Sequence, residues 1–139
     1  MKTIYQNQNN FIETLGYFEQ WYEKFNYLIE LGELLPTVCP EELLSHRVFA
    51  CQSMTFFCAW VESGWLRANG WSNAPVQRGL IVSIIEMFDR TPIHELTDVG
   101  DIYFHDHSDL INQLTPLRRE GLKEIIRRII VLCSPKENV

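Results

Sequence analysis

Hydrophobic residues between positions 11 and 31 recur every three or four residues, the spacing that gathers side chains on one face of a helix. The pattern predicts a helix with a broad aromatic face and a break near Gly16. Gly32 fits the end of this helix, because glycine commonly terminates helices. Residues 1–10 are rich in Asn and Gln, and we expect them to fray.

Two segments with the composition of β-strands follow. Residues 54–61 are largely apolar on both alternating faces, which predicts a central strand covered on both sides. Ser63-Gly64 supplies a turn, and residues 65–71 return as a second strand. Together with the short apolar pair 48–49, these segments predict a three-stranded antiparallel sheet.

The next part of the chain has a helical pattern. Ser72 or Asn73 can cap a helix that has Pro75 in its first turn and ends near residue 88. A shorter helical piece is expected to open at Thr91-Pro92.

A final helix is predicted from Leu117 to the proline at position 135, with isoleucine and leucine side chains along one face. The segment before it, residues 100–112, has a looser pattern. No internal repeat or linker interrupts the chain. We therefore predict a single domain over residues 1–139 with a C-terminal tail at 134–139. Its class is α+β, with a small three-stranded antiparallel sheet packed against helices.

Composition narrows the class of protein. The 139 residues are 46% hydrophobic and 22% charged, which is typical of a globular domain. Apolar runs are too short to span a membrane and the N-terminus lacks a signal-peptide core, so we expect a cytoplasmic protein with no membrane partner. The net charge of −6 disfavours nucleic acid as the main partner. In the cytoplasm the four cysteines are expected to be free thiols.

Cys51 lies in a small polar break, Ala50-Cys51-Gln52-Ser53, between two apolar runs. A strand interrupted in this way bends, which places the thiol at a tip that a partner can reach. Gln52 and Ser53 can offer hydrogen bonds there, and the apolar flanks can wall a pocket that raises the pKa of the thiol and protects it. From these residues alone, Cys51 is either a reactive thiol or one more small buried residue.

The other cysteines and the histidines give less support for a reactive or metal-binding site. Cys39 lies in a loop, Cys58 and Cys133 are expected in the core, and no pair of cysteines has the spacing of a zinc site or dithiol motif. His105-Asp106-His107 has the residue types of a metal-binding fragment, but its further ligands would have to come from elsewhere in the chain. We therefore predict no metal site. A cysteine–histidine dyad for hydrolysis stays open, although no oxyanion-hole motif accompanies Cys51.

Several short motifs occur in a fixed order between residues 21 and 130. They are residues 21–32 followed by Leu35-Pro36, Cys51-Gln52-Ser53, Ser72-Asn73-Ala74 with Gly79-Leu80-Ile81, Thr91-Pro92, and Leu114-Thr115-Pro116-Leu117-Arg118 with Gly121-Leu122. In this order and spacing the chain resembles the SufE/CsdE family of sulfur acceptors, which serve cysteine desulfurases in iron–sulfur cluster assembly. Each motif alone is short, and the specificity comes from their order.

The resemblance implies an α+β fold and a cysteine tucked into an apolar cavity at a loop tip. It implies that Cys51 takes persulfide sulfur from a cysteine desulfurase and passes it to a cluster-assembly scaffold, with Gln52 and Ser53 shaping the loop. Arg118 matches a family arginine associated with docking on the desulfurase, and Arg119 would assist. No cofactor is implied on this chain, since the pyridoxal phosphate belongs to the desulfurase. The chain would act as a carrier rather than as an enzyme.

Three departures from the family pattern bear on this expectation. Ala50 stands where the family has glycine, Asn73 on the expected partner-binding face replaces an aspartate, and Leu117 replaces a serine. These departures favour a divergent member of the family, and two alternative functions stay open. One is a regulatory module that docks on a desulfurase without carrying sulfur, and the other is a cysteine hydrolase or peroxidase with a low thiol pKa. Arg118 and Arg119 can equally be surface charges paired with neighbouring glutamates.

Overall fold

The computed structural model describes residues 1–133, and the tail predicted at 134–139 lies outside the described residues. Short 3₁₀ turns occur at η1 (Gly32–Leu34), η2 (Glu41–Leu43), η3 (Ile93–Glu95) and η4 (Val99–Asp101). The helices and strands, in chain order, are α1 (Thr3–Gly16), α2 (Trp21–Leu31), β1 (Thr55–Glu62), β2 (Trp65–Ser72), α3 (Pro75–Phe88), β3 (Thr91–Pro92), α4 (Phe104–His107), α5 (Leu110–Gln113) and α6 (Pro116–Ile130). The fold class is α+β, as predicted.

The sheet is antiparallel, with three strands in the order β1-β2-β3. β1 and β2 pair along their whole length around the predicted turn at Ser63-Gly64. The third strand is β3 rather than the predicted pair 48–49, and β1 is an edge strand rather than the central one. Alternation of side chains indicates that a segment is extended, but it does not say which segment pairs with it, because pairing is a long-range choice.

Two short segments account for this correction. Thr91-Pro92, which we expected to open a helix, pairs with the start of β2, and the helical turn η3 begins only afterwards. Proline donates no backbone hydrogen bond, which suits it to the edge of a sheet. Residues 48–49 form no strand. Instead the backbone nitrogen of Val48 donates to the carbonyl of Thr55 at 2.8 Å and closes the base of a loop.

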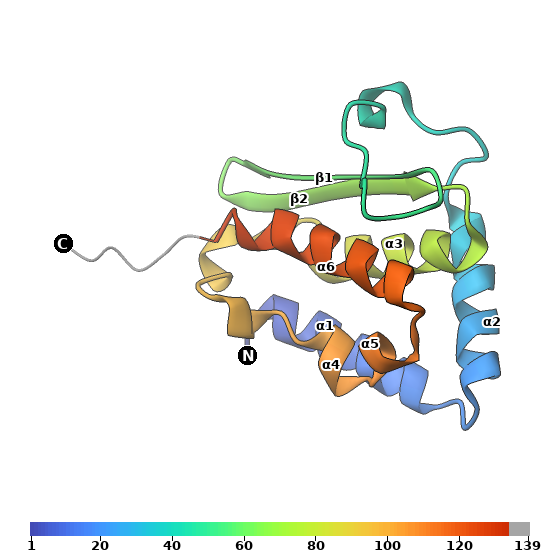
Figure 1. Cartoon of the computed structure of the whole chain (residues 1–139). Helices are drawn as coiled ribbons and strands as arrows, with labels where there is room; N and C mark the ends of the chain where they lie inside the picture. The colour runs from blue at the N-terminus through green and yellow to red at the C-terminus, as the bar shows by residue number, and fades with distance from the viewer. Residues whose placement is uncertain (134–139) are drawn as a thin grey trace.

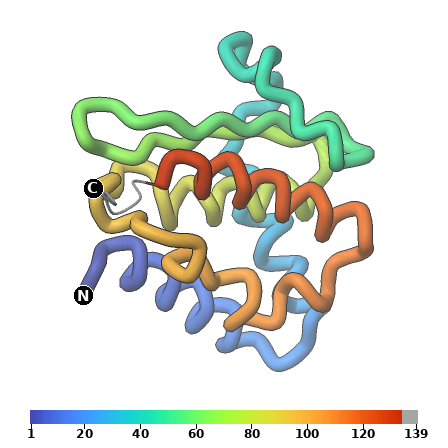
Figure 2. The backbone as a smooth tube through the Cα atoms, turned by 60° about the vertical axis from the view of Figure 1, so that its left-hand side comes forward, coloured from blue at the N-terminus to red at the C-terminus, as the bar shows by residue number. Residues whose placement is uncertain are grey.

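The molecule is built in layers beneath the β1–β2 hairpin. α3 and α6 run side by side along one face of the sheet, and α1 lies on the far side of these two helices (Figure 1; Figure 2). The core between the layers contains fully buried side chains from each, including Phe57 of β1, Ile84 of α3 and Ile129 of α6. α3 and α6 both begin at the end of the hairpin where β1 starts (Figure 1).

Residues 3–10 do not fray as predicted, because they belong to α1, which is tied to a distant loop. Ile4 and Gln8 are fully buried. The Gln8 amide donates to the carbonyl of Asp101 at 2.8 Å and accepts from the nitrogen of Tyr103 at 2.8 Å. Gln8 and Asn9, two of the polar residues that suggested disorder, are therefore hydrogen-bond partners of that loop. The break predicted near Gly16 is confirmed, since α1 ends there and α2 begins at Trp21.

The two helices that face the sheet were predicted well. α3 has Pro75 at its first position and ends at Phe88, as expected. Its N-cap is Ala74, however, and not Ser72 or Asn73, whose side chains make other hydrogen bonds. α6 begins one residue before the predicted Leu117 and ends at Ile130, before the proline at position 135 that was expected to stop it. Within residues 1–133, no helix has the length and apolar content needed to cross a membrane.

Candidate functional site

Cys51 lies at the tip of a closed loop that leads into β1. The loop is pinched at its base by the hydrogen bond between Val48 and Thr55, and the nitrogen of Cys51 donates back to the carbonyl of Val48 at 3.2 Å. The side chain turns inward, so that only 6% of Cys51 is exposed. The predicted position at a tip is thus combined with a thiol that solvent barely reaches.

The sulfur is held between α3 and α6. Gln77, in the first turn of α3, donates from Nε2 to Sγ of Cys51 at 3.6 Å. Sγ also rests on Gly121 of α6, where an added Cβ atom would lie 2.2 Å from the sulfur and 3.7 Å from Nε2 of Gln77. Glycine is therefore required at position 121 if the thiol is to keep this place.

Burial raises the pKa of the Cys51 thiol above its ordinary value, with the nearby carboxylate of Glu124 acting in the same direction. Hydrogen bonds from Thr55 and Gln77 act in the opposite direction but are outweighed. The resting thiol is consequently protonated at neutral pH. Since the thiolate is the nucleophile, Cys51 is protected until its surroundings change.

An ion pair on α6 anchors the loop. Glu124 accepts from the backbone nitrogen of Ala50 through Oε1 at 3.2 Å, and its Oε2 pairs with Arg128 at 2.5 Å. Arg128 in turn donates to three backbone carbonyls around the loop, those of His46, Arg47 and Phe57. Because the charges are half-buried and satisfied by backbone groups, this pair fixes the loop more firmly than an exposed pair would.

The predicted loop residues Gln52 and Ser53 flank the thiol differently. Gln52 is exposed. Ser53 Oγ lies 2.9 Å from Thr55 Oγ1, which in turn lies 2.9 Å from Ser72 Oγ on the neighbouring strand. Asn73, expected on the partner-binding face, is also a loop anchor, since its Oδ1 accepts from the nitrogen of Met54 at 3.1 Å.

A pocket of about 440 Å³ opens beside the thiol. The residues that line this pocket are Cys51, Gln52, Ser53, Ala74, Gln77, Thr115, Leu117 and Arg118. Arg118 therefore shares the pocket with Cys51, whereas Arg119 does not line it.

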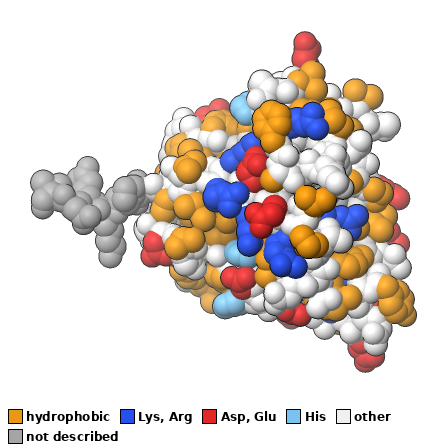
Figure 3. All heavy atoms as spheres, in the orientation of Figure 1, with side chains coloured by type: hydrophobic (Ala, Val, Ile, Leu, Met, Phe, Trp, Pro, Cys, Tyr) orange, Lys and Arg blue, Asp and Glu red, His pale blue; other side chains and the backbone are white. Residues whose placement is uncertain are grey.

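The two arginines make different contacts. Arg119 donates to the carbonyl of Leu114 at 3.3 Å, whereas Arg118 offers its backbone nitrogen to the helix cap Thr115. Within the described residues neither arginine forms an ion pair, because Glu120 and Glu124 pair with Lys123 and Arg128 instead. Figure 3 shows basic and acidic side chains interspersed on this face of the molecule.

Other candidate groups lie in different surroundings. Cys58 and Cys133, expected in the core, are only half-buried, and burial raises the pKa of each thiol. Burial also lowers the pKa of His105, whose Nδ1 has no hydrogen-bond partner in residues 1–133. In the same part of the chain, no cluster of three or more His, Cys, Asp or Glu side chains is arranged to hold a metal ion.

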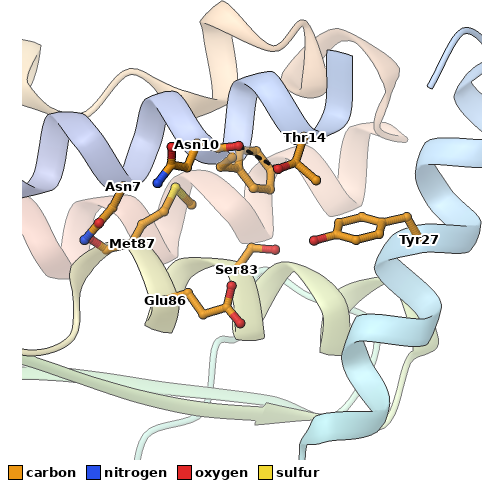
Figure 4. Close-up of a pocket in the computed structure, with 8 residues that line it drawn as sticks. Asn7, Asn10, Thr14, Tyr27, Ser83, Glu86 and Met87 are labelled. Atoms are coloured by element: carbon orange, nitrogen blue, oxygen red, sulfur yellow. Dashed lines mark hydrogen bonds between the residues drawn. The ribbon is translucent and has the colours of Figure 1, made fainter. Parts of the chain in front are cut away.

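A second pocket, of about 220 Å³, lies between α1, α2 and α3 (Figure 4). Burial raises the pKa of Glu86 and of Tyr27, which line it. Three of its other polar side chains already donate to backbone carbonyls: Asn7 to Met87, Thr14 to Asn10 and Ser83 to Gly79. This pocket contains none of the residues singled out from the sequence.

Four residues were not predicted to belong to the site: Gln77, Gly121, Glu124 and Arg128, although Gly121 is part of a motif that carries the family resemblance. The sequence did contain an indication for Gly121. Glycine inside a predicted helix makes that helix less stable, so its presence there indicates that another group packs closely against the backbone. Gln77 interrupts the apolar pattern of its helix and is nevertheless buried. Nothing in the sequence marks Glu124 and Arg128, whose spacing is that of any surface pair on a helix.

Known proteins resemble this chain over most of its length. The sequence model of the SufE family, described as an Fe-S metabolism associated domain, matches residues 9–132. A SufE-like protein of Rhizobium meliloti is 28% identical over 124 residues, covering 85% of this chain and 88% of that protein. A SufE-like protein of Rhizobium etli is 24% identical over 123 residues, covering 85% and 83%.

One solved structure shares the fold. It is the solution structure of a hypothetical protein from Thermus thermophilus, which superposes with a TM-score of 0.70 at 23% identity. The similarity covers 91% of this chain and 92% of that one.

Proposed function

The chain belongs to the SufE family, and from this membership and the geometry around Cys51 we propose that it accepts sulfur from a cysteine desulfurase. The sulfur is carried as a persulfide on Cys51 and passed to a scaffold for iron–sulfur cluster assembly. The observation that carries the proposal is a thiol that is buried yet borders an open pocket. A carrier needs both features, because its cargo must be delivered and then shielded from stray thiols.

The transfer is a thiol–persulfide exchange that needs no cofactor on this chain. The Cys51 thiolate attacks the outer sulfur of the donor persulfide, a new S–S bond forms on Sγ, and the donor's S–S bond breaks to release its thiol. One proton leaves Cys51 and one is returned to the donor sulfur, so no oxidant or reductant is consumed. The chain acts as an acceptor, with the chemistry that generates the sulfur left to the desulfurase.

Attack requires the buried thiol to become accessible. The loop near the thiol is held closed by the hydrogen bonds of Ala50 to Glu124 and of Met54 to Asn73, while Arg128 anchors the base of the loop. A docked partner that displaced them would expose Cys51 and relieve the burial that raises its pKa. Docking would in this way activate the thiol only where the donor is present.

The partner-binding surface is proposed to surround the pocket mouth. Arg118 supplies a cation without an internal ion pair among the described residues, and Arg119 follows it on the same helix. Phe49 on the loop is 80% exposed and Leu117 is 46% exposed. An apolar contact framed by positive charge suits a partner with acidic residues around an apolar patch. We place both proteins in the cytoplasm.

Mass spectrometry of the intact protein tests the proposal directly. The protein is incubated with an active cysteine desulfurase and free cysteine, beside Cys51→Ser and the half-buried control Cys58→Ser. We expect the wild type and the control to gain one sulfur atom that reductant removes, and Cys51→Ser to gain none.

The regulatory alternative makes a different prediction. A module that docks without carrying sulfur would bind the desulfurase in both forms and gain no sulfur in either. Rapid alkylation of Cys51 at pH 6 without a partner would instead favour the hydrolase or peroxidase interpretation, since that chemistry needs a low thiol pKa.

A further inference from the structure

We propose that Gln77 is the residue that positions the sulfur cargo, with its side-chain amide bonded to both sulfur atoms of a persulfide on Cys51. Nε2 would donate to the inner sulfur, and Oε1 would accept from the terminal S–H. The inference rests on the proposed function and assigns a role to a residue outside the motifs that identified the family.

The first observation is the place of the amide. Gln77 lies in the first turn of α3, is only 4% exposed, and lines the pocket beside Cys51. Its Nε2 already donates to Sγ of Cys51. A glutamine buried at the wall of a pocket and directed at the one thiol there is placed to act on whatever that thiol carries.

The second observation is an unused acceptor. Oε1 of Gln77 is buried and has no hydrogen-bond partner among residues 1–133. Buried polar atoms are almost always paired, and an exception calls for a specific reason. Oε1 belongs to the same amide group whose Nε2 contacts Sγ. A donor attached to Sγ would satisfy it.

A persulfide supplies that donor. After transfer, the added sulfur is one S–S bond from Sγ, and it carries a hydrogen where the thiol had one. The α6 backbone at Gly121 closes one side of Sγ, and the open space beside Sγ is the pocket that Gln77 also lines, so we place the added atom in that pocket. Burial disfavours charge on a sulfur held at this place, and it therefore acts toward the protonated persulfide, which can donate to Oε1.

The test loads Cys51 without a desulfurase, so that it does not depend on the partner. Sodium tetrasulfide at alkaline pH is the sulfur source, because part of the Cys51 thiol ionises there even without a partner. The thiolate attacks a terminal sulfur atom of the tetrasulfide and expels a trisulfide dianion. Mass spectrometry of the Cys51 peptide then follows loss of the added sulfur to a thiol reductant. The variants are Gln77→Met, which keeps the length but not the hydrogen bonds, and Gln77→Glu, which keeps an acceptor oxygen. Gln6→Met on the exposed side of α1 is the matched control.

We expect Gln77→Met to lose sulfur about fivefold faster than the wild type, the factor for one hydrogen bond of ordinary strength. Gln77→Glu should retain sulfur longer than Gln77→Met, and Gln6→Met should match the wild type. If Gln77 acted only by filling space, the Met and Glu variants would lose sulfur at the same rate. If Gln77→Met does not fold, Gln77→Asn replaces it, because its shorter amide cannot reach both atoms.

The inference is overturned if the Met or Asn variant holds sulfur as long as the wild type, or if Glu is no better than Met. A wild type that loads from tetrasulfide but takes nothing from an active desulfurase would count against the proposed function alone. The role of Gln77 would still be decided by the tetrasulfide experiment.

Discussion

Sγ of Cys51 rests on the backbone of Gly121, so closely that a Cβ atom at position 121 would lie 2.2 Å from the sulfur. Two segments far apart in the sequence thereby share one small space, and the thiol stays inside only because α6 has no side chain there. The protection of Cys51 is thus a property of the helix beneath it as much as of its own loop.

Gly121→Ala should displace the thiol and leave the fold intact. Alanine stabilises a helix interior by roughly 0.5–1 kcal/mol relative to glycine, and the atom it meets is the end of a side chain that can rotate away. We expect Cys51 to become more exposed and its alkylation at pH 8 to accelerate by roughly tenfold. Peptide-resolved alkylation measures this rate.

Gly16→Ala is the control for that experiment, because a Cβ atom there meets nothing within 4 Å. The Cys51 alkylation rate in this variant should equal that of the wild type. An unchanged rate in Gly121→Ala would contradict the close packing of sulfur on α6.

Stability should fall with alkaline pH in a way that depends on Cys51. Burial raises the pKa of this thiol in the folded state above its unfolded value of about 8.5. Between those two pKa values the folded state binds more protons, so the free energy of unfolding decreases as pH rises. The contribution is fully present below about pH 8.5 and is lost as pH rises through the folded pKa.

Urea unfolding of the wild type and Cys51→Ser at pH 7 and at alkaline pH measures this contribution. Serine does not titrate in this range, so the variant should lose less stability between the two conditions. Equal losses in the two proteins would show that the Cys51 thiol is not desolvated.

Removing the loop anchor should loosen the cysteine loop. Glu124→Ala eliminates the acceptor for Ala50 and leaves Arg128 without its carboxylate partner, at a cost of about 1–3 kcal/mol in the free energy of unfolding. We expect faster amide hydrogen exchange in residues 46–51. Glu120→Ala is the control, because its exposed pair with Lys123 contributes at most about 1 kcal/mol. Equal exchange in the two variants would count against Glu124 as an anchor.

Arg118→Ala should weaken binding to the desulfurase without changing stability. Arg118 lines the pocket beside Cys51, and loss of its charge is expected to reduce affinity roughly tenfold and to lessen its dependence on salt. Calorimetry at two salt concentrations checks both effects. Arg127→Ala removes an exposed charge near the other end of α6 and should change neither. A similar loss in both variants would indicate general charge attraction rather than docking through Arg118.

Local patterns determined α3, the start of α6 and the hairpin, but not α4 and α5, which lie in or beside the segment with the looser pattern. The apolar repeat of α6, the proline that opens α3 and the glycine turn between β1 and β2 each act over a few residues, and each is found where it was predicted. Predictions that needed a distant partner failed. The Asn- and Gln-rich N-terminus is ordered because Gln8 meets the loop at residues 101–104, and the third strand is Thr91-Pro92 because it lies next to β2.

At the site too, local features could be predicted from the sequence, whereas contacts between distant segments could not. The sequence alone picked out Cys51 and its loop, because a polar break between apolar runs is a local signal, and it included Arg118 through a family motif. Only the tertiary structure decided that the thiol points inward, that Gln77 and Gly121 enclose it, and that Glu124 and Arg128 hold its loop. Those residues come from two helices whose approach is set by core packing, and no spacing along the chain records which side chains such packing brings together.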